Sequence, residues 1–272
     1  MNTESKHPIP TPAMPPLANG PVRTAKHLLL KTMSKLVPPP LWHWLDLRVR
    51  QRIPSPGRVR FGDLSRVTPI SREFGFDRGL PVDRYYIEKF LVNNAGDIRG
   101  RILEIGDNEY TLRFGGNRVV VSDVLHVRSG NPKATLIGDL ACGDHLPADA
   151  FDCIVLTQTL HLIYDVRAAL TTCFRILKPG GVLLITTPGC SQVECGEWRE
   201  TWYWSFTVLS LRKLIEEACF AASVEAYGNV LAGVALLHGL ATNELSQPKL
   251  DHRDPLYPVL VTGRALKPRL PE

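Results

Sequence analysis

Short apolar runs alternate with amphipathic segments through most of the chain after residue 99. A helix is expected over 166–177, where apolar residues recur at helical spacing and Lys178-Pro179-Gly180-Gly181 forms a strong stop. The runs expected to form strands are 101–105, 118–122, 134–137, 152–157 and 182–187. Repeated strand–helix units of this length predict an α/β fold with a mostly parallel central sheet and right-handed crossovers.

Weaker patterns flank these units on both sides. A short helix is expected over 83–91, with Asp83 as its N-cap, because its apolar residues form one stripe. Further elements are expected to be a helix over 210–220 and strands over 223–227 and 258–262.

The first 60 residues differ in composition from the rest. Residues 1–21 are rich in proline with few apolar anchors, so we expect a disordered tail. We expect a basic helical extension over 22–60 and the main domain over 61–272. The first 60 residues hold ten Lys or Arg against Glu4 and Asp46, whereas the whole chain has a net charge of +5. Such an arm could meet nucleic acid, an anionic surface or an acidic partner, or be a solvated tail without one.

Bulk properties narrow the class of protein. The chain is 44% hydrophobic and 22% charged, as globular proteins are, and lacks the ~18–20 apolar residues in a row that span a bilayer. Prolines interrupt the region where a secretory signal would need an apolar stretch, so we expect a cytoplasmic protein. The six cysteines have no zinc-ligand spacing, so we expect reduced thiols and no metal site.

Chemistry is expected at the strand ends, because ligands of open parallel sheets bind beyond the carboxyl ends of the strands. Glu104 and Gly106 end the first run, and Asp123 and Asp139 end the second and third. These acidic groups suit a ligand with an ammonium group, a ribose diol and an adenine amine. The Gly-x-Gly-x-x-Gly motif of dinucleotide dehydrogenases is absent.

Four segments together resemble class I S-adenosylmethionine-dependent methyltransferases, and most closely the large type 11 group. They are Arg101-Ile-Leu-Glu-Ile-Gly106, Gly138-Asp139-Leu140, Phe151-Asp-Cys-Ile-Val-Leu-Thr-Gln158 and Arg175-Ile-Leu-Lys-Pro-Gly-Gly-Val-Leu-Leu184. The resemblance covers residues 99–190 and implies a Rossmann-like methyltransferase fold with S-adenosylmethionine as cofactor. Flanking segments such as Phe74-Gly-Phe-Asp-Arg-Gly79 and Trp204-Ser-Phe-Thr207 resemble a bacterial subgroup often associated with glycan-modifying genes.

The resemblance also implies roles for individual residues. It assigns Glu104 and Gly106 to the methionine moiety, Asp123 to the ribose hydroxyls and Asp139 to the adenine amine. Leu140 would pack on the adenine face, and Gln158 is a further expected cofactor contact. The chain departs from the family at Gly106-Asp107-Asn108, which lacks the second glycine, and its spacing from Glu104 to Asp123 is about one helical turn short. Asp123 and Asp139 could instead cap helices, whereas a functional or hydrogen-bonded role is favoured for Glu104, which lies inside an apolar run.

Catalysis would need mainly positioning, because the sulfonium already carries an activated methyl group. A hydroxyl acceptor could also need a general base, and His161, after the fourth strand, is the candidate, with His126 as a weaker one. The alternative for His161 is a purely structural role. The aromatic segment that contains Trp198, Trp202 and Tyr203 would help to build an acceptor site or would pack as a lid.

Three functions remain open from the sequence. We favour methyl transfer to a hydroxyl of a small-molecule or glycan acceptor. A nucleic-acid methyltransferase is disfavoured, because Thr157-Gln158-Thr159-Leu160 replaces the Asn/Asp-Pro-Pro-aromatic motif of exocyclic-amine enzymes. The altered glycine turn leaves a non-catalytic binding or assembly protein with a degenerate methyltransferase fold as the alternative.

Overall fold

A computed structural model describes residue 54 and residues 57–269 of the chain. The chain divides into two units, one up to Ser65 and one from Arg66 onward. In the first unit the described residues form a short helical turn over Gly62–Ser65. The expected tail over 1–21, and almost all of the expected extension over 22–60, lie outside the described residues.

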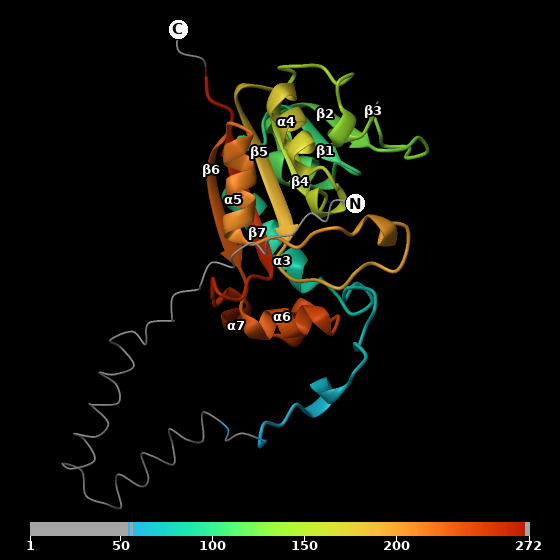
Figure 1. The fold of residues 1–272 in the computed structure, drawn as a ribbon, viewed down its shortest axis with the longest axis vertical. Helices are drawn as coiled ribbons and strands as arrows, with labels where there is room; N and C mark the ends of the chain where they lie inside the picture. The colour runs from blue at the N-terminus through green and yellow to red at the C-terminus, as the bar shows by residue number, and fades with distance from the viewer. Residues whose placement is uncertain (1–53, 55–56, 270–272) are drawn as a thin grey trace, which may run out of the picture. The chain divides into compact units, whose positions relative to one another are not determined.

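The second unit is built on a seven-stranded sheet, in the order β3-β2-β1-β4-β5-β7-β6 (Figure 1). The strands are β1 (Gly100–Ile105), β2 (Val119–His126), β3 (Leu136–Ile137), β4 (Phe151–Thr157), β5 (Leu177–Pro188), β6 (Ala221–Tyr227) and β7 (Leu260–Leu266). The first five run parallel, whereas β7 is antiparallel to both of its neighbours. The predicted α/β fold with a mostly parallel sheet is therefore confirmed.

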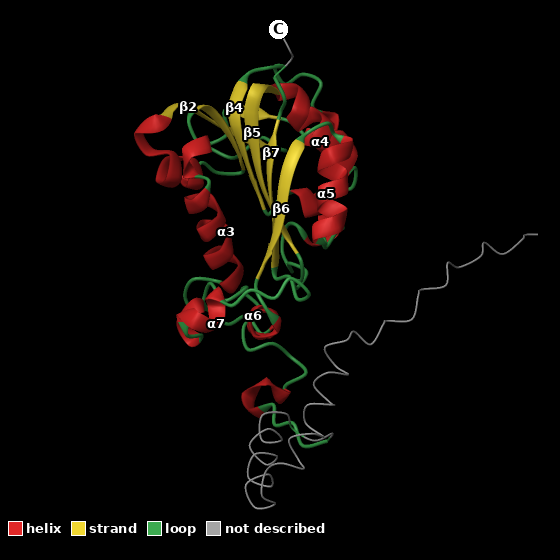
Figure 2. Ribbon diagram, turned by 90° about the vertical axis from the view of Figure 1, so that its left-hand side faces the viewer, coloured by secondary structure: helices red, strands yellow, loops and turns green. Residues whose placement is uncertain are grey.

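Helices cover both faces of the sheet (Figure 2). They are α3 (Val82–Asn93), α4 (Val166–Ile176), α5 (Val208–Glu217), α6 (Val230–Leu237) and α7 (Gln247–Asp251). One face packs against α3 and the other against α4 and α5. In β5, Leu183 faces α4 and α5, whereas Leu184 faces α3, because successive side chains of a strand point to opposite faces of the sheet. Burial on both faces explains why this run is the most apolar of the runs that were expected to form strands.

Several expected boundaries were wrong. Strand β2 continues to His126, so Asp123 lies inside the strand and not at its end. Helix α3 begins after Pro81, which places Asp83 in its first turn and not at its N-cap. The last strand, β7, covers Leu260–Leu266 and not 258–262. Helix α6 was not expected, because its sequence is apolar on every side and has no period to detect.

The connection between β1 and β2 is unusually short. A single π-helical turn, η3 (Thr111–Gly115), followed by one further helical turn (Gly116–Arg118), spans the distance. This π-helical turn ends at Gly115. This short connection brings the backbone of η3 close to the end of β1.

Candidate functional site

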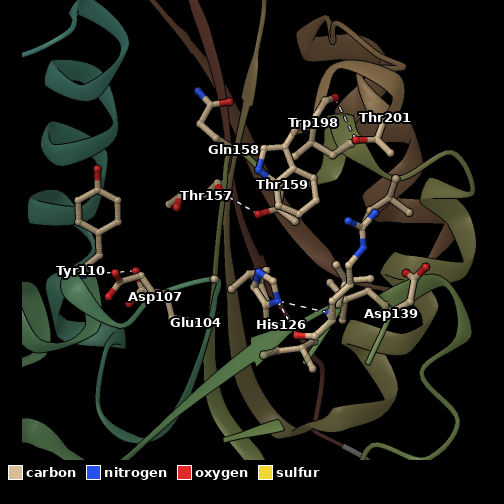
Figure 3. Close-up of a pocket in the computed structure, with 18 of the residues that line it drawn as sticks. Glu104, Asp107, Tyr110, His126, Asp139, Thr157, Gln158, Thr159, Trp198 and Thr201 are labelled. Carbon is tan, nitrogen blue, oxygen red and sulfur yellow. Dashed lines mark hydrogen bonds between the residues drawn. The ribbon is translucent and has the colours of Figure 1, made fainter. Parts of the chain in front are cut away.

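A cavity of about 880 Å³ opens at the carboxyl ends of the parallel strands (Figure 3). This is where open α/β sheets bind ligands. The strands contribute the floor, which is formed by residues 104–107, 125–128, 138–141 and 157–159. The walls come from Phe76, Leu80, Arg84 and Glu88 near α3, Glu109 and Tyr110 before η3, residues 162–165 after β4, and Trp198, Thr201 and Tyr203 after β5.

Glu104 is buried beneath this cavity, with 3% of its surface exposed. Its carboxylate accepts hydrogen bonds from the backbone amides of Thr111, at 2.7 Å, and Tyr110, at 3.3 Å. Burial raises the pKa of Glu104 to about 7, although these hydrogen bonds favour the charged form. The carboxyl group therefore changes its charge near neutral pH at the floor of the cavity.

Gly106 leaves an opening in the cavity wall. Its φ is +81°, which side chains rarely permit, and a Cβ atom there would meet nothing within 4 Å. Its amide donates to the carbonyl of Leu125 at 2.9 Å, which fixes the turn against β2. The backbone is thus exposed to a ligand at this point.

Asp139 and Leu140 lie side by side at the end of β3. One carboxylate oxygen of Asp139 accepts from the amide of Ala141 at 2.8 Å and caps a short helical turn, η5 (Leu140–Cys142). The other oxygen has no partner among the described residues. Leu140 is 3% exposed and lines the cavity beside it. Asp139 is therefore a cap that still has an oxygen free for a ligand.

Gln158 follows β4 in a left-handed conformation, with a φ of +44°. A non-glycine residue in this region stores strain, and such strain is concentrated at functional sites. Its amide donates to the carbonyl of Thr186 at 3.0 Å, so the sheet holds the strained turn in place. Gln158 lines the cavity together with Thr157 and Thr159.

The structure does not bring Asp123 to the cavity. Its carboxylate accepts from Nε of Arg101 at 2.7 Å and from Oγ1 of Thr135 at 2.8 Å, and the residue is 8% exposed. In the sheet it pairs with Leu103, two residues before the end of β1. This placement supports a structural role for Asp123 and does not support the expected contact with the ribose.

His126 holds the strand-end position that Asp123 was expected to hold. It is the last residue of β2 and lines the cavity. Its Nδ1 lies 2.8 Å from the carbonyl oxygen of Arg128, and its ring meets the Trp198 ring edge-on. The spacing of about 20 residues from the first glycine to the ribose contact in Rossmann folds could have identified it.

His161 also lies away from the cavity lining. It is 1% exposed, and its ring centroid is 4.4 Å from that of Trp202. Neither ring nitrogen has a hydrogen-bond partner in the described part of the chain, and burial lowers the pKa of His161 to about 4. The structure therefore does not support His161 as the general base.

Arg84 and Tyr110 form a polar pair that sequence reasoning missed. Nη1 of Arg84 donates to the phenol oxygen of Tyr110 at 3.0 Å, and both residues line the cavity. Burial raises the pKa of Tyr110, so the phenol keeps its proton. Within the described residues Arg84 has no carboxylate within salt-bridge distance. The pair therefore presents a positive charge and hydrogen-bond donors to a ligand.

Three exposed aromatic residues lie together, and two of them, Tyr164 and Tyr203, line the cavity. Tyr164 stacks on Trp204 at 6.0 Å between centroids and meets Tyr203 edge-on at 5.3 Å. The amides of Tyr203 and Trp204 both donate to the carbonyl of His161, which fastens this segment to the turn after β4. We call Tyr164, Tyr203 and Trp204 the rim aromatics.

The described side chains do not gather three His, Cys, Asp or Glu into a group that could hold a metal ion. Within residues 57–269, no helix is long and apolar enough to cross a membrane.

Comparisons with known proteins identify the family. Residues 65–228 match the family model described as a methyltransferase domain. The chain is 29% identical over 117 residues to the ubiquinone/menaquinone biosynthesis C-methyltransferase UbiE of Cronobacter sakazakii, and 26% identical over 117 residues to that of Pasteurella multocida. Each match covers 36% of this chain and 47% or 44% of the relative, so the chain spans about half the length of these curated relatives.

A solved structure of an S-adenosylmethionine-dependent methyltransferase from Mesorhizobium loti is similar, with 19% identity and a TM-score of 0.48. The similarity covers 71% of this chain and all of that one. The family match spans more than half of the 272 residues. This chain therefore belongs to the methyltransferase-domain family, as its resemblance to class I S-adenosylmethionine-dependent methyltransferases predicted.

Proposed function

We propose that this chain transfers the methyl group of S-adenosylmethionine to a small-molecule acceptor, and that both bind in the cavity at the strand ends. The cavity volume of about 880 Å³ supports this proposal. It lies near the top of the range of about 300–1,000 Å³ for small-molecule sites, so it has room for a donor and an acceptor.

The observation that carries the donor site is the opening at Gly106. A glycine at positive φ with free space at its Cβ position lets a ligand approach the backbone closely. The free oxygen of Asp139 would accept from the adenine amine, and Leu140 would pack against the adenine ring. Gln158, across the floor, would complete the donor contacts.

The Arg84–Tyr110 pair fits the other end of the donor. The methionine moiety ends in a carboxylate, and guanidinium groups bind carboxylates through charge-assisted hydrogen bonds. Glu104 lies at the same end of the cavity, where its carboxylate would favour the ammonium group. The charges available at this end therefore match both charged groups of an amino acid.

Little further chemistry is required of the protein. S-adenosylmethionine supplies an activated methyl group when it is bound. The chain would hold the donor and the acceptor in line and exclude water between them, and such positioning can provide much of the acceleration. The segment after β5 that carries Trp198 and Tyr203 lines the cavity and suits that second role.

The rim aromatics favour an acceptor with a ring. Exposed aromatic faces stack on sugar rings and on planar molecules. A hydroxyl on a small molecule or glycan remains our proposed target. Methyl transfer to a planar phenol or quinone, without transfer to any glycoside, would contradict the glycan part of the proposal.

The proposal is tested first by calorimetry with S-adenosylmethionine and S-adenosylhomocysteine. We expect both to bind, and Gly106→Val to abolish binding, because it strains the turn and fills the opening. Gly96→Ala is the matched control, since that glycine also has open space but no positive φ. Transfer of labelled methyl groups to glycosides and phenols then identifies the acceptor class.

The alternative non-catalytic protein rests on one observation. Asn108 stands where the family has its second glycine. Such a protein would bind neither compound, or would bind them without turnover of any acceptor. Donor binding together with methyl transfer to a ring-bearing acceptor would exclude it.

A further inference from the structure

The loop before α3 exposes two large apolar side chains at the cavity. Phe76 and Leu80 both line the cavity, and both are exposed. Tyr164 and Tyr203, which also line it, are exposed as well. Single apolar side chains on a surface need no explanation, whereas several at one opening indicate a binding site. We call Phe76, Leu80, Tyr164 and Tyr203 the apolar mouth.

The backbone of this loop is attached at both ends. The carbonyl of His238 accepts from the amides of Ile70 and Ser71, each at 3.0 Å. At the other end, the amide of Thr242 donates to the carbonyl of Leu80 at 2.8 Å. The exposure of Leu80 therefore belongs to an ordered loop that the segment after α6 holds in place.

An aromatic stack joins the same loop to the segment after β5. Phe74 has a φ of +55°, a strained conformation for a residue with a side chain, and its ring stacks on Trp202 at 6.0 Å between centroids. Nε2 of Gln192 also donates to the carbonyl of Arg72 at 2.7 Å. Since Tyr203 follows Trp202 directly, the two sides of the apolar mouth lie on segments that contact each other.

The polar side chains of the loop are paired away from the cavity. Oγ of Ser71 donates to the carboxylate of Asp77 at 2.5 Å. The guanidinium of Arg78 forms a bidentate ion pair with Glu244, with 3.0 Å between Nε and Oε2. Neither Asp77 nor Arg78 lines the cavity. The loop therefore presents apolar and not charged side chains to a ligand.

We propose that the apolar mouth binds an aliphatic chain carried by the acceptor, so that the acceptor is an amphiphile with a polar ring and an apolar substituent. This inference rests on the proposed function, because it places the ring of the acceptor in the same cavity. The chain would extend from the ring over Phe76 and Leu80. Each methylene that leaves water there should tighten binding by about two- to fourfold.

The test is calorimetry of the full chain, with and without S-adenosylhomocysteine, on two series of ring compounds. Methyl, ethyl and butyl β-glucoside form one series, and 4-methyl-, 4-ethyl- and 4-butylphenol form the other. Within each series the ring stays the same and only the chain changes. We expect the affinity to rise by about two- to fourfold per methylene in at least one series.

Variants then locate the chain. Leu80→Ser and Phe76→Ser should weaken binding by a factor that grows with chain length, because a polar surface replaces the apolar one. Leu231→Ser is the matched control, since Leu231 is 39% exposed against 40% for Leu80 but does not line the cavity. It should bind every compound as the wild type does. Thermal unfolding of each variant without ligand verifies that it is folded.

Three results would overturn the inference. The first is an affinity that does not depend on chain length in either series, or no binding by any member. The second is a rise with chain length that both Leu80→Ser and Phe76→Ser preserve, which would place the chain elsewhere. The third is sedimentation with phosphatidylcholine vesicles that Leu80→Ser abolishes, without a chain-length effect in solution, which would assign the apolar mouth to a membrane surface.

Donor binding separates this inference from the proposed function. In each of these three cases S-adenosylhomocysteine can still bind the wild type, and methyl transfer to an acceptor without a chain remains the proposed activity. A wild type that does not bind S-adenosylhomocysteine overturns the proposed function, and the acceptor role of the apolar mouth with it.

Discussion

Glu104 is held by two backbone amides at the start of η3, yet burial makes its charge costly. Its pKa rises from 4.5 to about 7 in the folded chain. The folded state therefore binds this proton more tightly than the unfolded state. Without ligand, the free energy of unfolding should fall as the pH rises through this window, by on the order of 3 kcal/mol from this group.

Glu104→Gln should remove that dependence, because an amide cannot ionise but can still accept from the Thr111 amide. Urea unfolding at several pH values between about 4.5 and 7 measures both proteins. We expect the variant to lose this fall with rising pH and to keep only the opposite contribution of His161, whose pKa burial lowers to about 4. Profiles that remain parallel would show that another group titrates there.

The two aspartates at β2 and β3 should behave oppositely. Asp123→Ala removes the partner of Arg101 and Thr135, so we expect unfolding free energy to fall by about 1–3 kcal/mol with donor affinity nearly unchanged. Asp139→Ala should lower donor affinity roughly tenfold with a smaller loss of stability. Calorimetry and urea unfolding of both variants provide the comparison, and a large affinity loss in Asp123→Ala would restore its expected ribose role.

A further prediction concerns His161, which is buried against the ring of Trp202. Both of its ring nitrogens are buried without partners in the described part of the chain, so His161→Leu should leave the unfolding free energy unchanged or raise it by about 1 kcal/mol. His161 should contribute a loss of stability as the pH falls from 6.5 towards about 4, opposite in sign to the contribution of Glu104, because the unfolded state binds this proton more tightly. The variant should lack this loss.

Methyl transfer decides whether the sequence-based role of His161 is correct. We expect near-normal turnover in His161→Leu. A large loss of kcat with unchanged donor affinity would instead mean that His161 acts on the acceptor.

At the scale of elements, helix α5 depends on its first turn. Thr207 and Ser210 form a capping box, in which the Thr207 hydroxyl accepts from the Ser210 amide and the Ser210 hydroxyl accepts from the Thr207 amide. Thr207→Ala should lower the unfolding free energy by about 0.5–2 kcal/mol. Thr207→Ser is the control, because it retains the hydroxyl. An equal loss in both variants would attribute the effect to the methyl group and not to the cap.

Elements whose contacts are local in sequence could be predicted, and those that depend on distant partners could not. The apolar run of β5 and the stop after α4 are visible in consecutive residues. The end of β2 was misjudged, because a carboxylate inside a strand normally signals its end. Asp123 is tolerated there by Arg101 and Thr135, and neither pairing can be read from neighbouring positions.

The candidate site divides in the same way. Glu104, Gly106, Asp139, Leu140 and Gln158 follow strand ends directly, and the structure brings all five to the cavity. Arg84 reaches it from a helix that precedes the sheet, so no motif around the strands could indicate it. His161 follows β4 as expected, but Trp202, far along the chain, covers its ring.

At the scale of the whole molecule, the site belongs to one unit of the chain. Every residue that lines the cavity lies between Phe76 and Tyr203, and both buried clusters lie within residues 82–266. A protein that begins at Arg66 should therefore fold cooperatively and bind S-adenosylhomocysteine with wild-type affinity. Thermal unfolding and calorimetry check this. A truncated protein that aggregates or loses binding would show that earlier residues contribute to the folded unit.

Strand β7 comes last of the seven strands along the chain, yet it lies between β5 and β6. While the ribosome is still synthesising the chain, β6 and α5 emerge before the strand that joins them to the sheet. Until Leu266 has left the exit tunnel, β5 has a bare edge and β6 has no neighbour at all. Bare edges recruit other strands, so the nascent chain is open to chaperones and to mispairing until β7 has emerged.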